Sequence, residues 1–440
     1  MKKTSSGEIK FGRDVKYSAA LLFNPALIIA LQSILALVLI WHQASSDPGY
    51  IIFVILPLII YLLYHTVIQR VQLSRTSFDA TPNDYFLPAS YYFCALLICF
   101  ITVLNAFAIL NLVVYYGGIS RAVDMLGSQS IVTELQANLP RYMTYIMGAN
   151  YALPVLIAPV LLRRVGFGSL ILILVSSVFA TIFGSLLASR IIFIDIIVSI
   201  IVITSLKYRL SIRSAVILLL FILLSFLGLV YLQASRIDSD WKKGLETLTK
   251  YYSVSILNGF NVISHNQQGQ TLYWTLRSTF DIPFVSQALG TESVYEGLFG
   301  HIPIKTRRDD FSYAAKLGAD PRYNTFGIYG YSFLDAGMWG MMILLASYVI
   351  VSILYRDYRR LGRIGIMLFP PMYSLVLDQL RTNSIYSSRA PFFIITAVVI
   401  YLFDKIVRRY LERNRLTQNG LDLNRYRKPV ANGYSWRVDR

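Results

Sequence analysis

The sequence predicts an all-α, polytopic membrane protein with about ten transmembrane helices, and three observations lead to this fold class. The 440-residue chain is 55% hydrophobic and only 15% charged, whereas soluble domains carry about 25% charged residues. Several apolar runs approach or exceed the roughly 18 residues that cross a bilayer as a helix. Basic residues are concentrated in alternate loops. Together these features exclude a soluble enzyme and a disordered chain.

Ten apolar segments divide the chain into five regions. The first segment follows several basic residues and is too long for a signal peptide, so we expect an uncleaved anchor. The predicted spans are Ala20–Trp41, Tyr50–Ile68, Leu87–Tyr115, Met143–Leu162, Ser169–Leu187, Ile191–Leu206, Ala215–Leu232, Tyr331–Leu354, Ile364–Leu380 and Pro391–Phe403, the last extending to Ile406. The regions are an N-terminal tail (1–19), spans one to seven (20–232), a large loop (233–330), spans eight to ten (331–406) and a basic tail (407–440).

The basic residues predict that both termini are cytoplasmic. Threading ten helices from a cytoplasmic N-terminus assigns 26 Lys and Arg but only nine Asp and Glu to the cytoplasmic side. The difference equals the whole net charge of +17, as the positive-inside rule requires. Topology and contact with anionic membrane lipids therefore explain the basic tail, and nucleic-acid binding is disfavoured.

The large outer loop, from Gln233 to Gly330, is much longer than the other connections, and loops of this length are usually functional. Four apolar residues recur in it at helical spacing among charged residues: Trp241, Leu245, Leu248 and Tyr252. They predict an amphipathic helix on the outer membrane surface. Asp238 and Asp240 form an Asp-x-Asp motif that could hold a divalent metal. We favour Asp240 as the N-cap of the helix instead.

Topology does not explain the arginines on the outer side. They include Arg121, Arg141, Arg190, Arg277, Arg322, Arg381 and Arg389. A guanidinium near the end of a span either reaches lipid phosphate or binds the phosphate of a ligand. For any one of these arginines, lipid contact or an ion pair is the better explanation. Because they come from three outer connections and the large loop, we expect them to form an anion site.

Two acids lie inside predicted spans, where a carboxylate usually faces protein or water. Asp378 lies three residues before Arg381 on the same helix face, so we expect an ion pair that neutralises both. Asp195 lies five residues after Arg190, on another side of the helix, and is expected to meet a different helix.

Two further residues are candidates for catalysis. Asp335 opens the eighth span, where its structural role would be that of an N-cap, and Gly337 and Gly340 after it would permit close helix packing. His301 precedes a group of basic residues, and neighbouring positive charge lowers the pKa of an imidazole, as a general base requires. A single loop histidine is more often structural.

Three short motifs carry a family resemblance. The segment from Asp320 to Gly327, which contains Arg322 and Asn324-Thr325, leads into a span with the pattern Asp335-x-Gly-x-x-Gly, and Ser189-Arg190 precedes an apolar span. These segments resemble the corresponding parts of Wzy-type oligosaccharide repeat-unit polymerases, the O-antigen polymerase family. The ten-span layout, with one large late outer loop and a short terminal one, is similar over nearly the whole chain.

The resemblance implies a GT-C-like glycosyltransferase in the bacterial cytoplasmic (inner) membrane, with its active face outside. It implies undecaprenyl-diphosphate-linked oligosaccharide as both donor and acceptor, no metal or other cofactor, and a chain-length regulator as a protein partner. On the matching positions, it carries over Arg190, Arg322, Asn324 and Asp335 as site residues. His301 has no match in the family's motifs.

These inferences lead to one hypothesis and two alternatives. Arg190, Arg141 and Arg322 would bind the donor diphosphate, and Arg381 and Arg389 either lipid diphosphate. His301 or Asp335 would act as the base, with Arg121 and Arg277 as further binding residues. An O-antigen ligase shares the layout and differs in its acceptor. A transporter or flippase would need basic residues along its path through the membrane, and the middles of the spans contain almost none.

Overall fold

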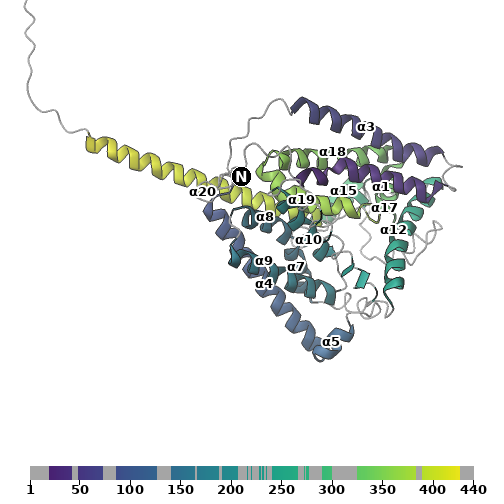
Figure 1. Ribbon diagram of the computed structural model, residues 1–440, viewed down its shortest axis with the longest axis horizontal. Coiled ribbons are helices and arrows are strands. Elements are labelled where there is room, and N and C mark those ends of the chain that lie inside the picture. The colour runs from purple at the N-terminus through teal and green to yellow at the C-terminus, as the bar shows by residue number, and fades with distance from the viewer. Residues whose placement is uncertain are drawn as a thin grey trace, which may run out of the picture.

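The computed structural model describes residues 19–41, 48–72, 86–125, 140–163, 166–187, 191–206, 240–265, 290–299, 325–382 and 389–426, with isolated positions between 216 and 276. Within these ranges the regular elements are all helices, which confirms the predicted class (Figure 1). The elements are η2 (Ala19–Phe23), α1 (Pro25–Leu39), α3 (Pro48–Gln72), α4 (Pro88–Tyr115), α5 (Ile119–Met125), α7 (Arg141–Asn150), α8 (Leu153–Arg163), α9 (Phe167–Leu186), α10 (Ile191–Ser205), α12 (Trp241–Ser264), α15 (Thr291–Phe299), α17 (Gly327–Ala336), η4 (Gly337–Trp339), α18 (Gly340–Arg359), α19 (Arg363–Asp378) and α20 (Arg389–Tyr426).

Six helical segments in the described part are long and apolar enough to cross a membrane. They are Pro48–Ile68, Pro88–Tyr115, Tyr142–Arg163, Phe167–Leu186, Gly327–Arg359 and Arg389–Asn414, which match predicted spans two to five, eight and ten. The helices at spans one and six have 15 residues each, and the helix at span nine has 16. Most of the seventh predicted span lies outside the described residues. The chain is thus a helical membrane protein, and the count of ten spans stays a prediction.

Three short helices form the centre of the bundle. Continuous runs of buried residues extend from Leu153 to Leu162 in α8, from Gly327 to Asp335 in α17 and from Gly365 to Val376 in α19. The longer helices α3, α4, α9 and α20 lie around them (Figure 1) and expose many large apolar side chains. In a membrane such side chains meet lipid, so protein encloses the short helices while the long ones form the lipid-facing surface.

The predicted eighth span is broken near its start. Helix α17 ends at Ala336, Gly337 has a φ of +55°, and α18 begins at Gly340. A Cβ on Gly340 would overlap the carbonyl oxygen of Ser332 in the preceding helix. The expected close packing therefore occurs at Gly340, between α17 and α18 across the break.

Helix α12 is longer than the predicted amphipathic segment and only its first half is exposed. Asp240 Oδ1 accepts a hydrogen bond from the Lys243 N–H at 3.0 Å, which confirms the N-cap. The second half is buried, and a Cβ on Gly259 would overlap the carbonyl oxygen of Phe326 beside α17. Figure 1 shows α12 running steeply across the direction of α1 and α3. The helix is therefore anchored in the protein by its second half.

Candidate functional site

A buried ion pair joins three helices where α19 ends and α20 begins. Arg389, the first residue of α20, donates from Nη1 to both carboxylate oxygens of Asp195 in α10, at 2.9 and 3.1 Å. Ser374 of α19 donates to the same carboxylate at 2.6 Å. The Arg389 and Asp195 side chains are only 5% and 1% exposed. The prediction that Asp195 meets another helix is confirmed, and its charge is compensated as a carboxylate among apolar helices requires.

A second ion pair is attached to the first through Asp378. Arg381 donates from Nε and Nη2 to the two carboxylate oxygens of Asp378, each at 2.8 Å, which confirms the predicted pair. Arg389 Nη2 approaches Asp378 Oδ2 at 3.4 Å. We name Asp195, Asp378, Arg381 and Arg389 the arginine cluster. Its two cations are balanced by two carboxylates, and Arg381 is the more accessible arginine, with 23% of its side chain exposed.

Tyr252 of α12 lies close enough to the arginine cluster to be affected by its charges. Burial raises the pKa of Tyr252 to about 12, with a smaller contribution from the negative charge of Asp378. Burial acts to lower the pKa of Arg381, but the charge of Asp378, the hydrogen bonds to it and the nearby Tyr252 and Tyr251 together raise the pKa overall. At neutral pH the cluster therefore combines a permanent cation with a protonated phenol, and both can donate hydrogen bonds.

The segment that enters α17 lies against the end of α19. The N–H of Gly327 donates to the carbonyl of Arg381 at 3.3 Å. Gly327 has a φ of +58°, and a Cβ there would lie 2.7 Å from the carbonyl oxygen of Leu380, so glycine is required. Arg322 and Asn324 lie outside the described residues, and in the sequence they come three residues and one residue before Thr325.

Thr325 connects this segment to α12. Its hydroxyl lies 2.5 Å from the Ser255 hydroxyl, and its carbonyl accepts a hydrogen bond from Asn258 Nδ2 at 3.2 Å. Ser255 and Asn258 were not predicted as site residues. The available signal was their position, since both are polar residues in the apolar half of α12. Helix α12 and the start of α17 thus form one unit beside the arginine cluster.

Asp335 fixes a turn of the large loop. Its carboxylate accepts hydrogen bonds from the N–H groups of Trp274 and Thr275, each at 2.6 Å, and from the Thr275 hydroxyl. The prediction that Asp335 caps the eighth span is wrong, because it lies near the C-terminal end of α17. It holds the start of the short helical stretch at 274–276 instead. With 2% of its surface exposed and three donors on its carboxylate, Asp335 is poorly placed as a general base.

The structure brings together only two of the predicted arginines whose side chains it describes, Arg381 and Arg389. Arg121 is exposed on α5, which lies at a corner of the fold away from α19 (Figure 1). Arg141 begins α7, but its side chain is not among those described. The other predicted site residues lie outside the described residues: Arg190, Arg277, His301, Arg322 and Asn324.

A second ion cluster lies about four helical turns further along α20. Asp404 accepts hydrogen bonds from Arg363 Nη1 at 2.7 Å and Arg408 Nε at 2.8 Å. The Ser90 hydroxyl and the Leu87 N–H donate to its other oxygen at 2.7 and 3.1 Å. We name these residues the Asp404 cluster, which joins α4, α19 and α20. Sequence reasoning counted Asp404 only as a cytoplasmic acid, although its spacing to Arg408 predicts an ion pair.

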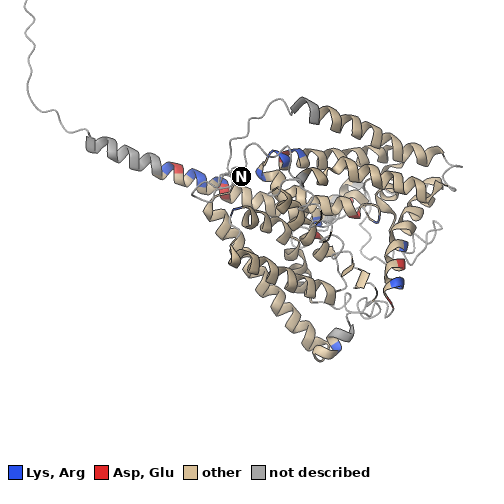
Figure 2. Cartoon of the chain, in the orientation of Figure 1, with Lys and Arg blue, Asp and Glu red and all other residues tan. Residues whose placement is uncertain are grey.

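Basic residues gather at the Asp404 end of the bundle. Figure 2 shows them along α20 and at the nearby ends of α18 and α19. This distribution agrees with the side that the sequence assigns to the cytoplasm, although the structure contains no membrane to fix the orientation.

In the described part of the chain, no three His, Cys, Asp or Glu side chains gather as a metal site would require. Comparison of the chain with known protein families, with curated proteins and with solved structures found no match. The resemblance to repeat-unit polymerases therefore depends on the quoted motifs and layout alone.

Proposed function

We propose that the chain is a membrane glycosyltransferase that polymerises undecaprenyl-diphosphate-linked oligosaccharide repeat units. The observation that carries this proposal is the arginine cluster. It fixes two guanidinium groups at the junction of three helices, beside α12 and the segment that enters α17. Guanidinium groups match the geometry of phosphate oxygens, and rigid ones stabilise charge without reorganising.

The proposed reaction breaks the bond between the anomeric carbon of the donor glycan and its diphosphate oxygen. A hydroxyl of the acceptor glycan forms the new bond to that carbon and loses its proton, while the diphosphate leaves with the electron pair. In this scheme Arg381 contacts the diphosphate, since its side chain is partly accessible and Asp378 takes two of its five N–H donors. Arg389 is a positioning residue, held by Asp195.

Further positive charge must come from neighbouring segments, because the arginine cluster is neutral as a unit. Arg190 immediately precedes α10, which carries Asp195. Arg322 lies three residues before Thr325, and Arg141 is the first residue of α7. We assign these three arginines to the donor diphosphate. Arg277 follows the turn that Asp335 holds, whereas Arg121 on α5 has no place in the scheme.

The scheme assigns the base to His301 and gives Asp335 a structural part. Asp335 is buried and its carboxylate already accepts three hydrogen bonds, so an acceptor hydroxyl would have to reach its remaining lone-pair site inside the bundle. His301 belongs to the same large loop, where the sequence places it just before a group of basic residues. These assignments are supported if Asp335→Asn keeps some activity and His301→Ala is inactive.

Purified protein in liposomes with undecaprenyl-diphosphate-linked repeat units tests the proposal. A ladder of products identifies a polymerase, whereas transfer only to a different acceptor identifies a ligase. Unaltered substrate that crosses the bilayer identifies a flippase. We expect Arg190→Ala to abolish the ladder while the yield of folded protein is unchanged, and Arg409→Ala, an exposed residue far along α20, to have no effect. Polymer of normal length from Arg190→Ala would contradict the assignment.

A further inference from the structure

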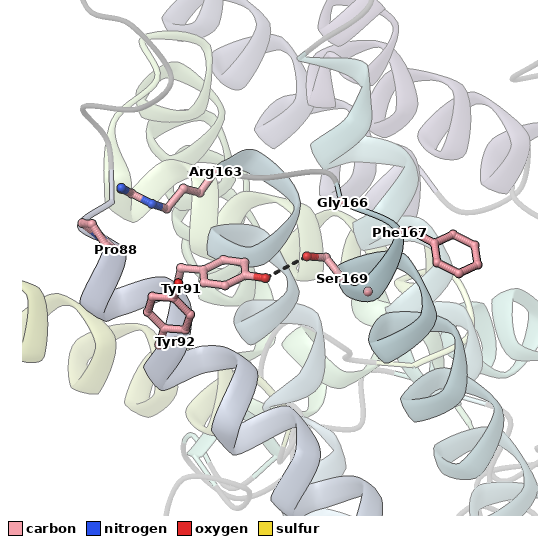
Figure 3. Close-up of a pocket in the computed structure, with 8 residues that line it drawn as sticks. Pro88, Tyr91, Tyr92, Arg163, Gly166, Phe167 and Ser169 are labelled. Atoms are coloured by element: carbon pink, nitrogen blue, oxygen red, sulfur yellow. Dashed lines mark hydrogen bonds between the residues drawn. The ribbon is translucent and has the colours of Figure 1, made fainter.

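A pocket of about 920 Å³ lies between the starts of α4 and α9, near the Asp404 cluster. Figure 3 shows Tyr91 of α4 facing Ser169 of α9, and their hydroxyl groups are 2.8 Å apart. Arg163 points away from α9 and donates to the carbonyl of Phe86. These polar groups are bonded within the protein and do not converge on a ligand.

A different arrangement lies where the large loop meets the start of α17. The indole of Trp274 packs against the rings of Phe326 and Tyr331, with centroid distances of 6.4 and 5.4 Å. The Phe326 and Tyr331 rings are 5.4 Å apart and meet edge to face. Both are buried, whereas Trp274 remains partly exposed. Two buried rings therefore support a tryptophan that is still accessible.

Asp335 holds the backbone of this tryptophan. Its two carboxylate oxygens accept the N–H groups of Trp274 and Thr275, each at 2.6 Å, and the Thr275 hydroxyl adds a third bond. The Leu272 N–H donates to the carbonyl of Asp335 at 3.3 Å. Burying a carboxylate is costly unless hydrogen bonds compensate it, and here the compensating bonds fix one turn of the loop. The backbone that carries the indole is therefore held in place by the protein itself.

The segment that supports the tryptophan also contacts the arginine cluster. Phe326, which packs against the indole, is followed by Gly327, whose N–H donates to the carbonyl of Arg381 at 3.3 Å. Ser255 of α12 contacts the same segment through Thr325. A glycan that begins at a diphosphate on Arg381 therefore starts beside this aromatic group.

We propose that Trp274 stacks on a sugar ring of the lipid-linked glycan, and that Asp335 is its positioning residue. This inference rests on the function proposed above. The face of an indole is electron-rich and attracts the slightly positive C–H groups on one face of a sugar ring, while the large apolar area of the indole is shielded from water. A platform that is already fixed loses little conformational freedom on binding. Trp274 thus contributes affinity for the glycan, whereas Arg381 contributes affinity for the diphosphate.

Native mass spectrometry of the full-length chain in detergent tests the inference with two ligands. One is undecaprenyl diphosphate, and the other is the same carrier linked to the repeat unit. The ratio of their dissociation constants measures the contribution of the glycan. We expect Trp274→Leu to reduce this ratio about tenfold, as loss of one aromatic contact predicts, without changing the affinity for undecaprenyl diphosphate. Trp339→Leu removes an exposed tryptophan outside the aromatic group and should change neither quantity.

A second measurement needs no substitution at Trp274. Hydroxyl radicals oxidise accessible tryptophans, and mass spectrometry of peptides locates the product. The glycan-linked carrier should protect Trp274 from oxidation, whereas undecaprenyl diphosphate should not, and Trp339 should be oxidised to the same extent with either ligand. Asp335→Asn removes the charge that holds the turn, so it should weaken the protection although Trp274 is still present.

The outcomes separate this inference from the proposed function. A chain that makes a product ladder, but shows neither a smaller ratio in Trp274→Leu nor protection of Trp274, keeps the proposed function and overturns the stacking role. An equal reduction in Trp339→Leu also overturns that role. Full protection of Trp274 in Asp335→Asn overturns the positioning role of Asp335. A chain that binds neither ligand contradicts the proposed function and overturns the inference with it.

Discussion

The two ion clusters along α20 bury charge of opposite sign. In the arginine cluster the most buried cation, Arg389, lies between the carboxylates of Asp195 and Asp378. In the Asp404 cluster a buried anion lies between two arginines that remain 28% and 32% exposed. The first cluster is closed to water around its central pair, and the second is open on its cationic side. Removing a charged side chain should therefore lower the free energy of unfolding more at the arginine cluster than at the Asp404 cluster.

The largest effect is expected for Arg389→Leu, which leaves Asp195 buried without its cation. Breaking a buried pair in this way costs about 3–5 kcal/mol. Thermal unfolding of the purified variant in detergent measures the loss. The double variant Asp195→Asn with Arg389→Leu should recover part of it, because no uncompensated charge is left. A single variant as stable as the unmodified chain would show that the pair contributes little.

An intermediate effect is expected for Asp404→Asn. The amide oxygen can still accept hydrogen bonds from Ser90 and the Leu87 N–H, but the charge that binds Arg363 and Arg408 is lost. Loss of hydrogen bonds between charged groups costs about 1.5–3 kcal/mol, and the partial exposure of both arginines reduces this. The same unfolding measurement applies. A loss larger than that of Arg389→Leu would reverse the proposed order of the two clusters.

The smallest effect is expected for Arg408→Ala, which removes a partly exposed partner one turn from Asp404. Exposed i, i+4 pairs contribute about 0.3–0.5 kcal/mol, and Arg363 still compensates the carboxylate. Salt should weaken the effect further because it screens accessible charges. At high salt, the unfolding midpoint of Arg408→Ala should therefore approach that of the unmodified chain. The lower midpoint of Arg389→Leu should persist at both low and high salt.

Local sequence spacing correctly predicted one ion pair and one helix N-cap. Asp378 and Arg381 are one turn apart, and Asp240 immediately precedes the helix that it caps, so adjacent residues determine both contacts. The partner of Asp195 could not be predicted, since Arg389 is 194 residues away and only packing of α10 against α19 and α20 brings it close.

Long-range contacts also explain why Asp335 was assigned to the wrong helix. The Asp-x-Gly-x-x-Gly pattern indicates a helix boundary, and the break at Gly337 is such a boundary. The sequence order does not reveal that the carboxylate points back to Thr275 in the large loop. Likewise, the apolar run across 331–354 predicts one continuous span, because hydropathy carries no information about a bend between buried segments.

The distance in sequence between Asp195 and Arg389 affects how the chain is assembled. Ribosomes synthesise the N-terminal partner first, so α10 must exist for some time without the cation that neutralises its carboxylate. During that interval Asp195 has to stay hydrated or protonated, because an uncompensated charge is costly inside the bilayer. Insertion of the C-terminal helix is thus the event that locks the bundle, and a chain truncated before residue 389 would be held at this incomplete stage.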